Sequence, residues 1–171
     1  NDTSENFFFL NRHNFQFQEA ALSRGVALTG NGATMSGMGV ACDDFDRNGW
    51  LDVLLTNFYQ ERSALYQNVG SGNFLDVADA TGVGAASRDR LGFGTVFLDA
   101  NHDRFPDLFV ANGHINDMSH VGVPYRMRQQ LLVNDGGKRF HDISDWSGAY
   151  FGRPLLGRGV DAGADRPDGL V

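Results

Sequence analysis

The chain has 171 residues, of which 42% are hydrophobic and 12% aromatic, so it holds enough apolar side chains to build a folded core. Its formal net charge of -7 argues against DNA or another nucleic acid as a partner, and against an anionic membrane surface. No apolar run is long enough to cross a bilayer and the first residues do not form a signal segment, so the chain as given is expected to be soluble.

The sequence repeats itself, with two kinds of element alternating along the chain. One element is GMGVACDDFDRNGWLDVLLTN at 37–57, which recurs without a gap as GFGTVFLDANHDRFPDLFVAN. In the other element an Asn precedes a Phe at a fixed spacing, and it occurs three times. Repeats of this kind indicate an array of similar structural units. The expected divisions are the end of one unit with its connection at 1–36, two complete units at 37–91 and 92–156, and the start of another at 157–171.

Short segments rich in β-branched and aromatic residues, bounded by Gly, Asn or Asp, predict four strands in each unit. In the first complete unit these segments are GVACDDF, LDVLLTNF, SALYQNV and NFLDVADA. Helix is expected only in brief turns, for instance near Glu19 to Arg24. Units of this length with four antiparallel strands are typical of β-propeller blades, so we predict an all-β partial propeller of about two complete blades with flanking partial blades. A β-solenoid is the alternative, although its repeats are usually much shorter.

Each complete unit also contains a loop in which oxygen-bearing side chains alternate. In DDFDRNGWLD, Asp44, Asp46 and Asn48 occupy places one, three and five, a glycine occupies place six and Asp52 occupies place nine. Crowded carboxylates repel one another, so the pattern indicates a bound cation. It resembles the start of an EF-hand loop, in which place seven, here Trp50, offers its backbone carbonyl. Calcium suits a flexible all-protein loop better than magnesium, which demands a stricter octahedron.

The second complete unit repeats the set of candidate ligands as Asp99, Asn101, Asp103, the carbonyl of Phe105, and Asp107. Arg104 stands at the glycine place, and we expect it to adopt a left-handed conformation at a cost of about 1 kcal/mol. The closing acid comes at place nine rather than twelve, which puts each metal in a β-hairpin turn. The third copy, at 164–171, lacks acids at places one and three, so no metal is expected there unless its register differs. The alternative for both complete loops is a solvated turn without a metal.

The Gly-x-Gly segments, the Asp-rich loops and LFVANGH resemble the FG-GAP or VCBS repeats of the integrin α-subunit propeller. Over essentially all 171 residues, the order of elements is most similar to bacterial relatives of cartilage acidic protein, which often carry an ASPIC and UnbV type domain. The resemblance implies an integrin-α-like propeller, commonly seven-bladed, with calcium in about two loops of this segment. It also implies an exported, cell-surface or periplasmic protein. Two complete blades cannot close a ring, so the remaining blades are expected from sequence outside this segment or from other copies.

The sequence favours a binding module over an enzyme. None of the five histidines lies in an HExxH, HxH or Cys-His spacing, and neither a Gly-x-Ser-x-Gly elbow nor a spare pair of glutamates is present. We therefore expect a calcium-stabilised scaffold that binds protein or glycan partners, as in adhesion, without inserting into a membrane. The alternative is a non-catalytic propeller domain of a larger extracellular enzyme. Within the insertion at 113–130, the candidates for partner contact are Tyr125, Arg126 and Arg128.

Overall fold

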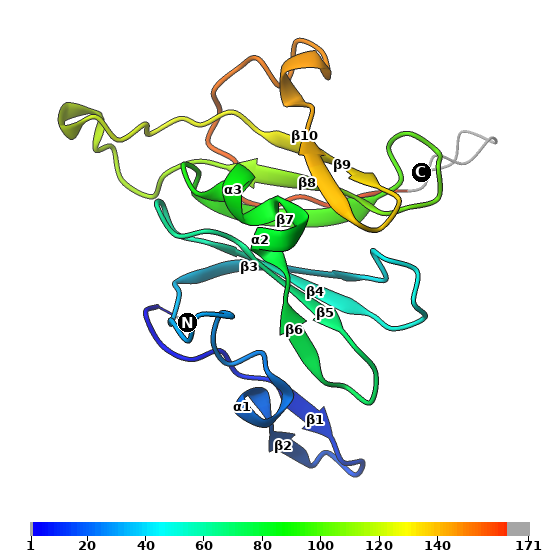
Figure 1. The fold of residues 1–171 in the computed structure, drawn as a ribbon. Helices are drawn as coiled ribbons and strands as arrows, with labels where there is room; N and C mark the ends of the chain where they lie inside the picture. The colour runs from blue at the N-terminus through cyan, green and yellow to red at the C-terminus, as the bar shows by residue number, and fades with distance from the viewer. Residues whose placement is uncertain (1, 164–171) are drawn as a thin grey trace.

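A computed structural model describes residues 2–163, and their strands form three antiparallel β-sheets (Figure 1). The small N-terminal sheet pairs β1 (Phe9–Asn11) with β2 (Phe17–Glu19). The first four-stranded sheet has the order β3 (Gly37–Asp43), β4 (Asp52–Asn57), β5 (Ala64–Asn68) and β6 (Phe74–Asp76). The second has the order β7 (Gly92–Leu98), β8 (Asp107–Asn112), β9 (Gln130–Asp135) and β10 (Arg139–Asp142). This mostly-β architecture confirms the predicted fold class and is consistent with a partial propeller.

The helices of the described residues are short: α1 (Ala21–Arg24), α2 (Ala78–Thr81), α3 (Val83–Ser87), and the 3-10 turns η1 (Ser119–Val121) and η2 (Ser144–Trp146). Helix α1 confirms the brief turn expected near this position. The prediction of strand across NFLDVADA is wrong at its end, because β6 stops at Asp76 and α2 begins two residues later. The Asp76 carboxylate accepts the Ala78 N–H at 3.1 Å, which turns the chain. Within residues 2–163, no helix has the length and apolar character needed to span a membrane.

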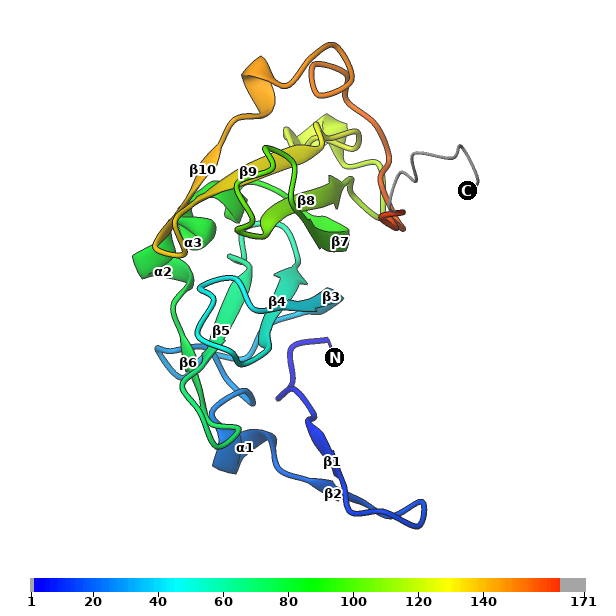
Figure 2. The same cartoon turned by 90° about the vertical axis from the view of Figure 1, so that its right-hand side faces the viewer.

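The two four-stranded sheets pack face to face, one above the other in Figure 2, and enclose the larger hydrophobic core. Strand alternation brings side chains from both sheets into this core, including Leu54, Leu65, Phe97, Leu108 and Leu132. Helices α2 and α3, which connect the sheets, close the outer side of the core. Burying each of these large side chains contributes roughly 1.5–3 kcal/mol, so the inter-sheet core is a main source of stability.

The Gly-x-Gly segments lie where the innermost strands of neighbouring sheets approach most closely. A Cβ atom at Gly39 of β3 would overlap the backbone carbonyl of Phe93 in β7. The same relation recurs one sheet later, where the Gly94 N–H donates to the Arg158 carbonyl at 2.5 Å. The second glycine of each motif is therefore required because the adjacent backbone leaves no room for a side chain.

A smaller core lies on the opposite face of the first sheet, under residues 20–30. Ala21 and Val26 pack there against Tyr66 and Phe74, and the ring of Phe8 meets that of Phe74 at 5.7 Å between centroids. The N-terminal segment therefore covers part of this face, and β1 and β2 extend beyond it (Figure 1).

Candidate metal centre

The two complete acidic loops occupy equivalent positions in the two large sheets. Residues 44–51 join β3 to β4, and residues 99–106 join β7 to β8. Both loops lie on the right of Figure 1, whereas residues 113–129, which join β8 to β9 and hold nearly all of the predicted insertion, extend from the opposite ends of the strands, on the left. The structure therefore places the candidate ligands in hairpin turns on one side of the stacked sheets.

The first loop is held in shape by side chains that bond to its own backbone. Asp44 accepts the N–H groups of Asn48 at 2.9 Å and Gly49 at 2.8 Å through its two carboxylate oxygens. Asp46 also accepts the Asn48 N–H, at 3.1 Å, and the Asn48 side-chain oxygen accepts the Trp50 N–H at 2.9 Å. These short-range bonds curl the chain and direct alternate side chains inward.

The second loop makes the same hydrogen bonds place by place. Asp99 accepts the N–H groups of Asp103 at 3.1 Å and Arg104 at 3.0 Å. Asn101 accepts the Asp103 N–H at 3.0 Å, and Asp103 accepts the Phe105 N–H at 2.8 Å. Because Asn replaces Asp at place three and Asp replaces Asn at place five, the loop shape depends on side-chain oxygens and tolerates either residue.

Two places in each loop have left-handed backbone conformations. At place six, Gly49 has φ of +90° and Arg104 has φ of +74°, which confirms the conformation expected for Arg104. At place four, Arg47 and His102 have φ of +60° and +61°. Sequence reasoning missed place four, because neither arginine nor histidine there signals a left-handed residue. Each non-glycine residue in this conformation costs about 1 kcal/mol, which the loop's hydrogen bonds offset.

The acids at place nine have a structural role that the sequence did not reveal. Asp52 and Asp107 are both fully buried, at 0% exposure. Asp52 accepts the Phe45 N–H at 3.0 Å and the Asn68 N–H at 2.7 Å. Asp107 makes the equivalent bonds to the loop and to the third strand of its own sheet, accepting the Ala100 and Asn134 N–H groups at 2.9 and 2.8 Å. Each carboxylate thus ties its acidic loop to the start of the Asn-to-Phe element.

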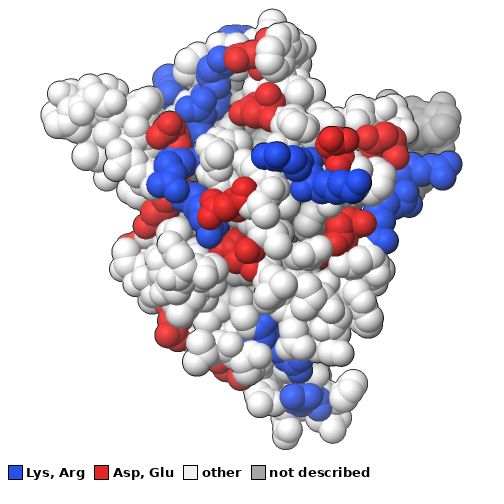
Figure 3. Space-filling view, in the orientation of Figure 1, with Lys and Arg blue, Asp and Glu red and all other residues white. Residues whose placement is uncertain are grey.

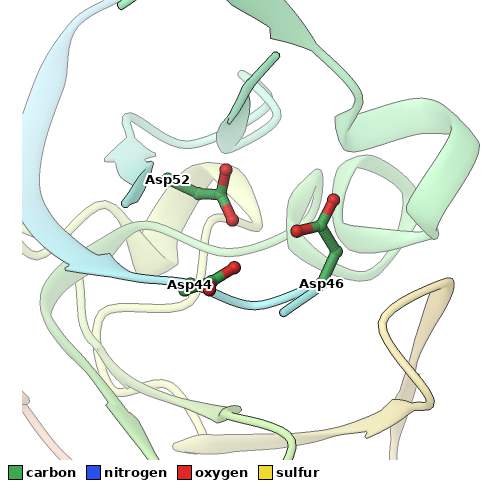
Figure 4. A group of neighbouring side chains, drawn as sticks. All are labelled: Asp44, Asp46 and Asp52. Atoms are coloured by element: carbon green, nitrogen blue, oxygen red, sulfur yellow. The ribbon is translucent and has the colours of Figure 1, made fainter. Parts of the chain in front are cut away.

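Three carboxylates of the first loop point toward one another (Figure 4). One oxygen from each of Asp44, Asp46 and Asp52 lies within 4.8 Å of the others. The three carboxylates of the second loop do not meet this condition, and no other cluster of three His, Cys, Asp or Glu residues does so within residues 2–163. Asp46 is also held from the side, because Gln67 Nε2 donates a short hydrogen bond to its Oδ2 atom.

The buried acid of each loop has a raised pKa. The pKa of Asp52 is raised to about 6, mainly by burial and to a smaller extent by the charges of Asp46 and Asp44, against the backbone hydrogen bonds that lower it. Burial likewise raises the pKa of Asp107, with smaller contributions from Asp103 and Asp99. In both loops the ionised form of the buried acid is therefore penalised in the folded protein, and a cation bound among the oxygens would offset that penalty.

The donor set fits a hard divalent cation. The first loop offers carboxylate oxygens from Asp44, Asp46 and Asp52, and hard cations such as calcium prefer oxygen ligands. Each carboxylate oxygen has more than one lone pair, so an oxygen that accepts a backbone N–H still has capacity to ligate. The N–H groups of Trp50 and Phe105 bond to the side chains at place five, while the role of their carbonyls as ligands stays a prediction. The loop at 164–171 lies outside the described residues.

Residues 44–110 match the model of an FG-GAP-like repeat. The match to the FG-GAP-like repeat begins at place one of the first acidic loop and ends within β8, so it includes both loops. It supports the FG-GAP repeats as the family of this region and agrees with the stacked four-stranded sheets. A comparison with curated proteins finds no match to the chain.

The other candidate residues lie away from the acidic loops. His114 is buried at 2% exposure between the rings of Phe58 and Tyr59, and its Nδ1 atom lies 2.9 Å from the Asn116 carbonyl oxygen. This environment makes His114 a packing residue of the insertion. The three candidates for partner contact lie in different environments. The Tyr125 carbonyl accepts the His114 N–H, Arg126 is exposed, and Arg128 lines a small polar cavity.

Proposed function

We propose that this chain is a calcium-binding propeller segment of an exported or cell-surface protein, similar to bacterial relatives of cartilage acidic protein. The observation that carries the proposal is the convergence of Asp44, Asp46 and Asp52 at a hairpin turn whose hydrogen bonds are repeated in the second loop. We assign about two calcium ions to the segment and no catalytic residue. The larger protein would then use the propeller as a scaffold for binding protein or glycan partners.

In this proposal the chain's own hydrogen bonds shape each loop, and calcium, when bound, supplies the positive charge that the clustered carboxylates lack. Asp44 and Asp46 in the first loop, and Asp99 and Asp103 in the second, present oxygens on a short, tightly turned backbone. The buried acid at place nine contributes charge from below and fixes the loop to the sheet. Calcium binding would therefore stabilise the blade edges without changing the fold.

The proposal also includes an adjoining blade on the open face of the first sheet. Val40, at 60% exposure, and Cys42 are both exposed on this face of β3. The equivalent residues of β7, Thr95 and Phe97, lie on the face of β7 that packs on the first sheet, and both are only 8% exposed. A cavity of about 350 Å³ on this open face is lined mostly by apolar residues, among them Phe7, Met38, Val40, Val53 and Leu55.

The stacking of the second sheet on the first supports an adjoining blade as the occupant of this cavity. In the structure, the Gly-x-Gly motif of β3 lets it approach the backbone of β7 closely. We expect the innermost strand of the adjoining blade to carry its own Gly-x-Gly motif and to pack against β3 in the same way. In this proposal the open face of the first sheet receives a further blade, either from sequence outside this segment or from another copy.

Calcium binding is tested by metal analysis combined with thermal unfolding. Native mass spectrometry of the purified chain should detect bound calcium, and chelation with EDTA should lower the Tm. Asp44→Asn combined with Asp99→Asn should abolish the difference between the calcium and EDTA melts, because both loops lose a charged ligand. Asp89→Asn is the matched control, since Asp89 is exposed and its side chain makes no hydrogen bond or ion pair with residues 2–163. Absence of bound metal together with identical melts in calcium and EDTA would contradict the proposal.

A further inference from the structure

A polar cavity of about 200 Å³ lies at the end of the second sheet opposite the acidic loops. Its walls come from segments that are far apart in the sequence: the residues before β7, the start of β9, the end of β10, and η2. The lining holds two cations and two carboxylates beside an exposed indole ring, namely Arg90, Arg128, Asp142, Asp145 and Trp146. No calcium ligand proposed above lines this cavity, so it is a separate site.

The equivalent place in the first sheet is closed by a buried ion pair. The two sheets pair in the same register, so Arg62 and Asp76 of the first correspond to Arg128 and Asp142 of the second. Arg62 donates to both oxygens of Asp76, at 3.3 and 2.6 Å, and the two side chains are 7% and 1% exposed. No ion pair joins Arg128 to Asp142 among residues 2–163. The first sheet therefore buries its arginine against this acid, and the second does not.

Two sequence differences between the units explain why the second place is open. Gln130 and Ser144 each stand where the first unit has an alanine. Gln130 donates to the Asp142 carboxylate at 2.8 Å, and Ser144 donates to it through its N–H at 3.0 Å and through its hydroxyl. These three bonds satisfy Asp142 without an arginine. Arg128 is thus left at the rim of the cavity, where 37% of its side chain is exposed.

At the rim, Arg128 forms an ion pair with an exposed acid. Its Nη2 atom lies 2.5 Å from the carboxylate of Asp145, whose side chain is 67% exposed. Its Nε donates to the Phe151 carbonyl at 2.7 Å, which holds the guanidinium in place. Its Nη1 has no hydrogen bond among residues 2–163 and, unlike the Nε of Arg90, is not buried. The pair therefore presents an N–H donor and a carboxylate acceptor side by side, both within reach of a ligand.

The charges of the lining favour a ligand without net charge. Two arginines and two aspartates cancel, so an anion would meet carboxylates in this cavity and a cation would meet guanidinium groups. Across the face shown in Figure 3, basic and acidic side chains likewise lie next to one another without a large area of one sign. A hydroxyl group both donates and accepts, so neighbouring hydroxyl groups of one molecule match the donor and acceptor of the Arg128–Asp145 pair.

The indole of Trp146 favours a ring over a flexible polyol. It lines the cavity yet is 81% exposed, so its flat face is available for contact with the apolar face of a ring. The turn η2 fixes it beside Asp145, because the Trp146 N–H donates to the Ile143 carbonyl at 2.9 Å. The cavity is smaller than typical sites for drug-sized ligands, which suits one six-membered ring.

We propose that this cavity binds a neutral pyranose residue of a glycan, with neighbouring hydroxyl groups on the Arg128–Asp145 pair and the ring against Trp146. The inference rests on the proposed glycan-binding role and names its ligand class, but it does not depend on the calcium loops. Titration with and without EDTA separates the two proposals, because sugar binding should be the same in both conditions whether or not the loops hold calcium.

The test titrates the full chain with methyl β-glucoside, methyl β-galactoside, methyl α-mannoside and their short neutral oligomers, followed by saturation-transfer NMR and tryptophan fluorescence. The uronide analogue of each glycoside adds a carboxylate, and tetrahydropyran supplies a ring without hydroxyl groups. Trp146→Ala should weaken binding of the best neutral glycoside about tenfold. Asp145→Ala should weaken it by a similar factor. Because Asp145→Ala leaves Arg128 unpaired, that variant should also bind the uronide more tightly than the neutral glycoside.

Matched controls separate this site from general effects of the substitutions. Asp79 holds the place of Asp145 in the first unit and pairs with Arg62, whose side chain is only 7% exposed, so Asp79→Ala should leave sugar binding unchanged. Phe15→Ala should also leave it unchanged, because Phe15 is a 99% exposed aromatic residue outside the lining. No binding of any neutral glycoside or oligomer, equal binding of tetrahydropyran, a parent chain that prefers the uronide, or an equal loss in Asp79→Ala overturns the proposal. Variant Tm values within about 2 °C of the parent show that the fold is retained.

Discussion

The bond that joins the two large sheets at their acidic loops offers a direct test of the blade-packing geometry. Asn134 is 1% exposed and its Nδ2 atom donates to two carbonyls, that of Phe45 in the first acidic loop at 2.8 Å and that of Pro106 at 3.0 Å. Its side-chain oxygen accepts the Gly137 N–H at 2.9 Å. At about 1 kcal/mol for each buried bond, Asn134→Ala should reduce the free energy of unfolding by about 3 kcal/mol.

Asn68 is the matched control because it holds the same place in the first sheet. It is 8% exposed and makes two comparable side-chain bonds, donating to the Leu51 carbonyl at 3.2 Å and accepting the Gly70 N–H at 3.0 Å. Among residues 2–163 its side chain has no bond to another sheet. Asn68→Ala should therefore cost about 2 kcal/mol. The deleted side chain is the same, so the loss of packing largely cancels between the variants.

The difference of about 1 kcal/mol measures the hydrogen bond between the sheets and corresponds to roughly 2–4 °C in Tm. Urea denaturation followed by circular dichroism gives both free energies, and an unchanged m-value shows that the unfolded state is the same in each variant. Equal losses, or a larger loss for Asn68→Ala, would refute the assignment of the Asn134 bond as a link between blades.

Two further predictions concern the open face of the first sheet and its buried tyrosine. Val40→Asp should change the unfolding free energy of this chain by less than about 0.5 kcal/mol, while Thr95→Asp, which buries a charge at the equivalent place, should cost several-fold more in the same denaturation assay. Similar costs would contradict an open face. Burial raises the pKa of Tyr66 to about 12, whereas an unfolded tyrosine ionises near pH 10. Between these values only the unfolded chain loses the proton, so stability should fall by up to about 1.4 kcal/mol per pH unit. Tyr66→Phe should flatten that fall, and an unchanged pH profile in the variant would count against it.

The sequence predicted those features that depend on local spacing. The alternating oxygens of residues 44–52 and their copy in the second unit located both hairpin turns, because a tight turn needs acceptors at alternate places. The unusual backbone of Arg104 followed from its alignment with Gly49. The end of the strand at Asp76 was missed because Val77 continues the alternating pattern, while the turn depends on the Asp76 carboxylate bonding to Ala78.

Features that depend on contacts between distant residues were not predictable in this way. The residues around Asp52 in the sequence do not indicate that its carboxylate accepts the N–H of Asn68 from another strand. The sequence therefore predicted only a metal-ligand role for Asp52. The Asn of the Asn-to-Phe element was visible as a repeat, but its function as the partner of the place-nine acid requires the sheet register. The cavity around Arg90 is likewise assembled from segments that are adjacent only after the second sheet forms.

The same contacts set how strongly calcium should affect stability. Asp52 and Asp107 each have both oxygens bonded to backbone N–H groups, so the loops keep their shape through hydrogen bonds and lack only a neutralising charge. Removing calcium should therefore lower the Tm and leave the circular dichroism spectrum at 25 °C unchanged. At a free calcium concentration of 100 Kd, one site contributes about 2.7 kcal/mol. A chain that unfolds outright on adding EDTA would show that the metal, and not the hydrogen-bonded turn, determines the loop conformation.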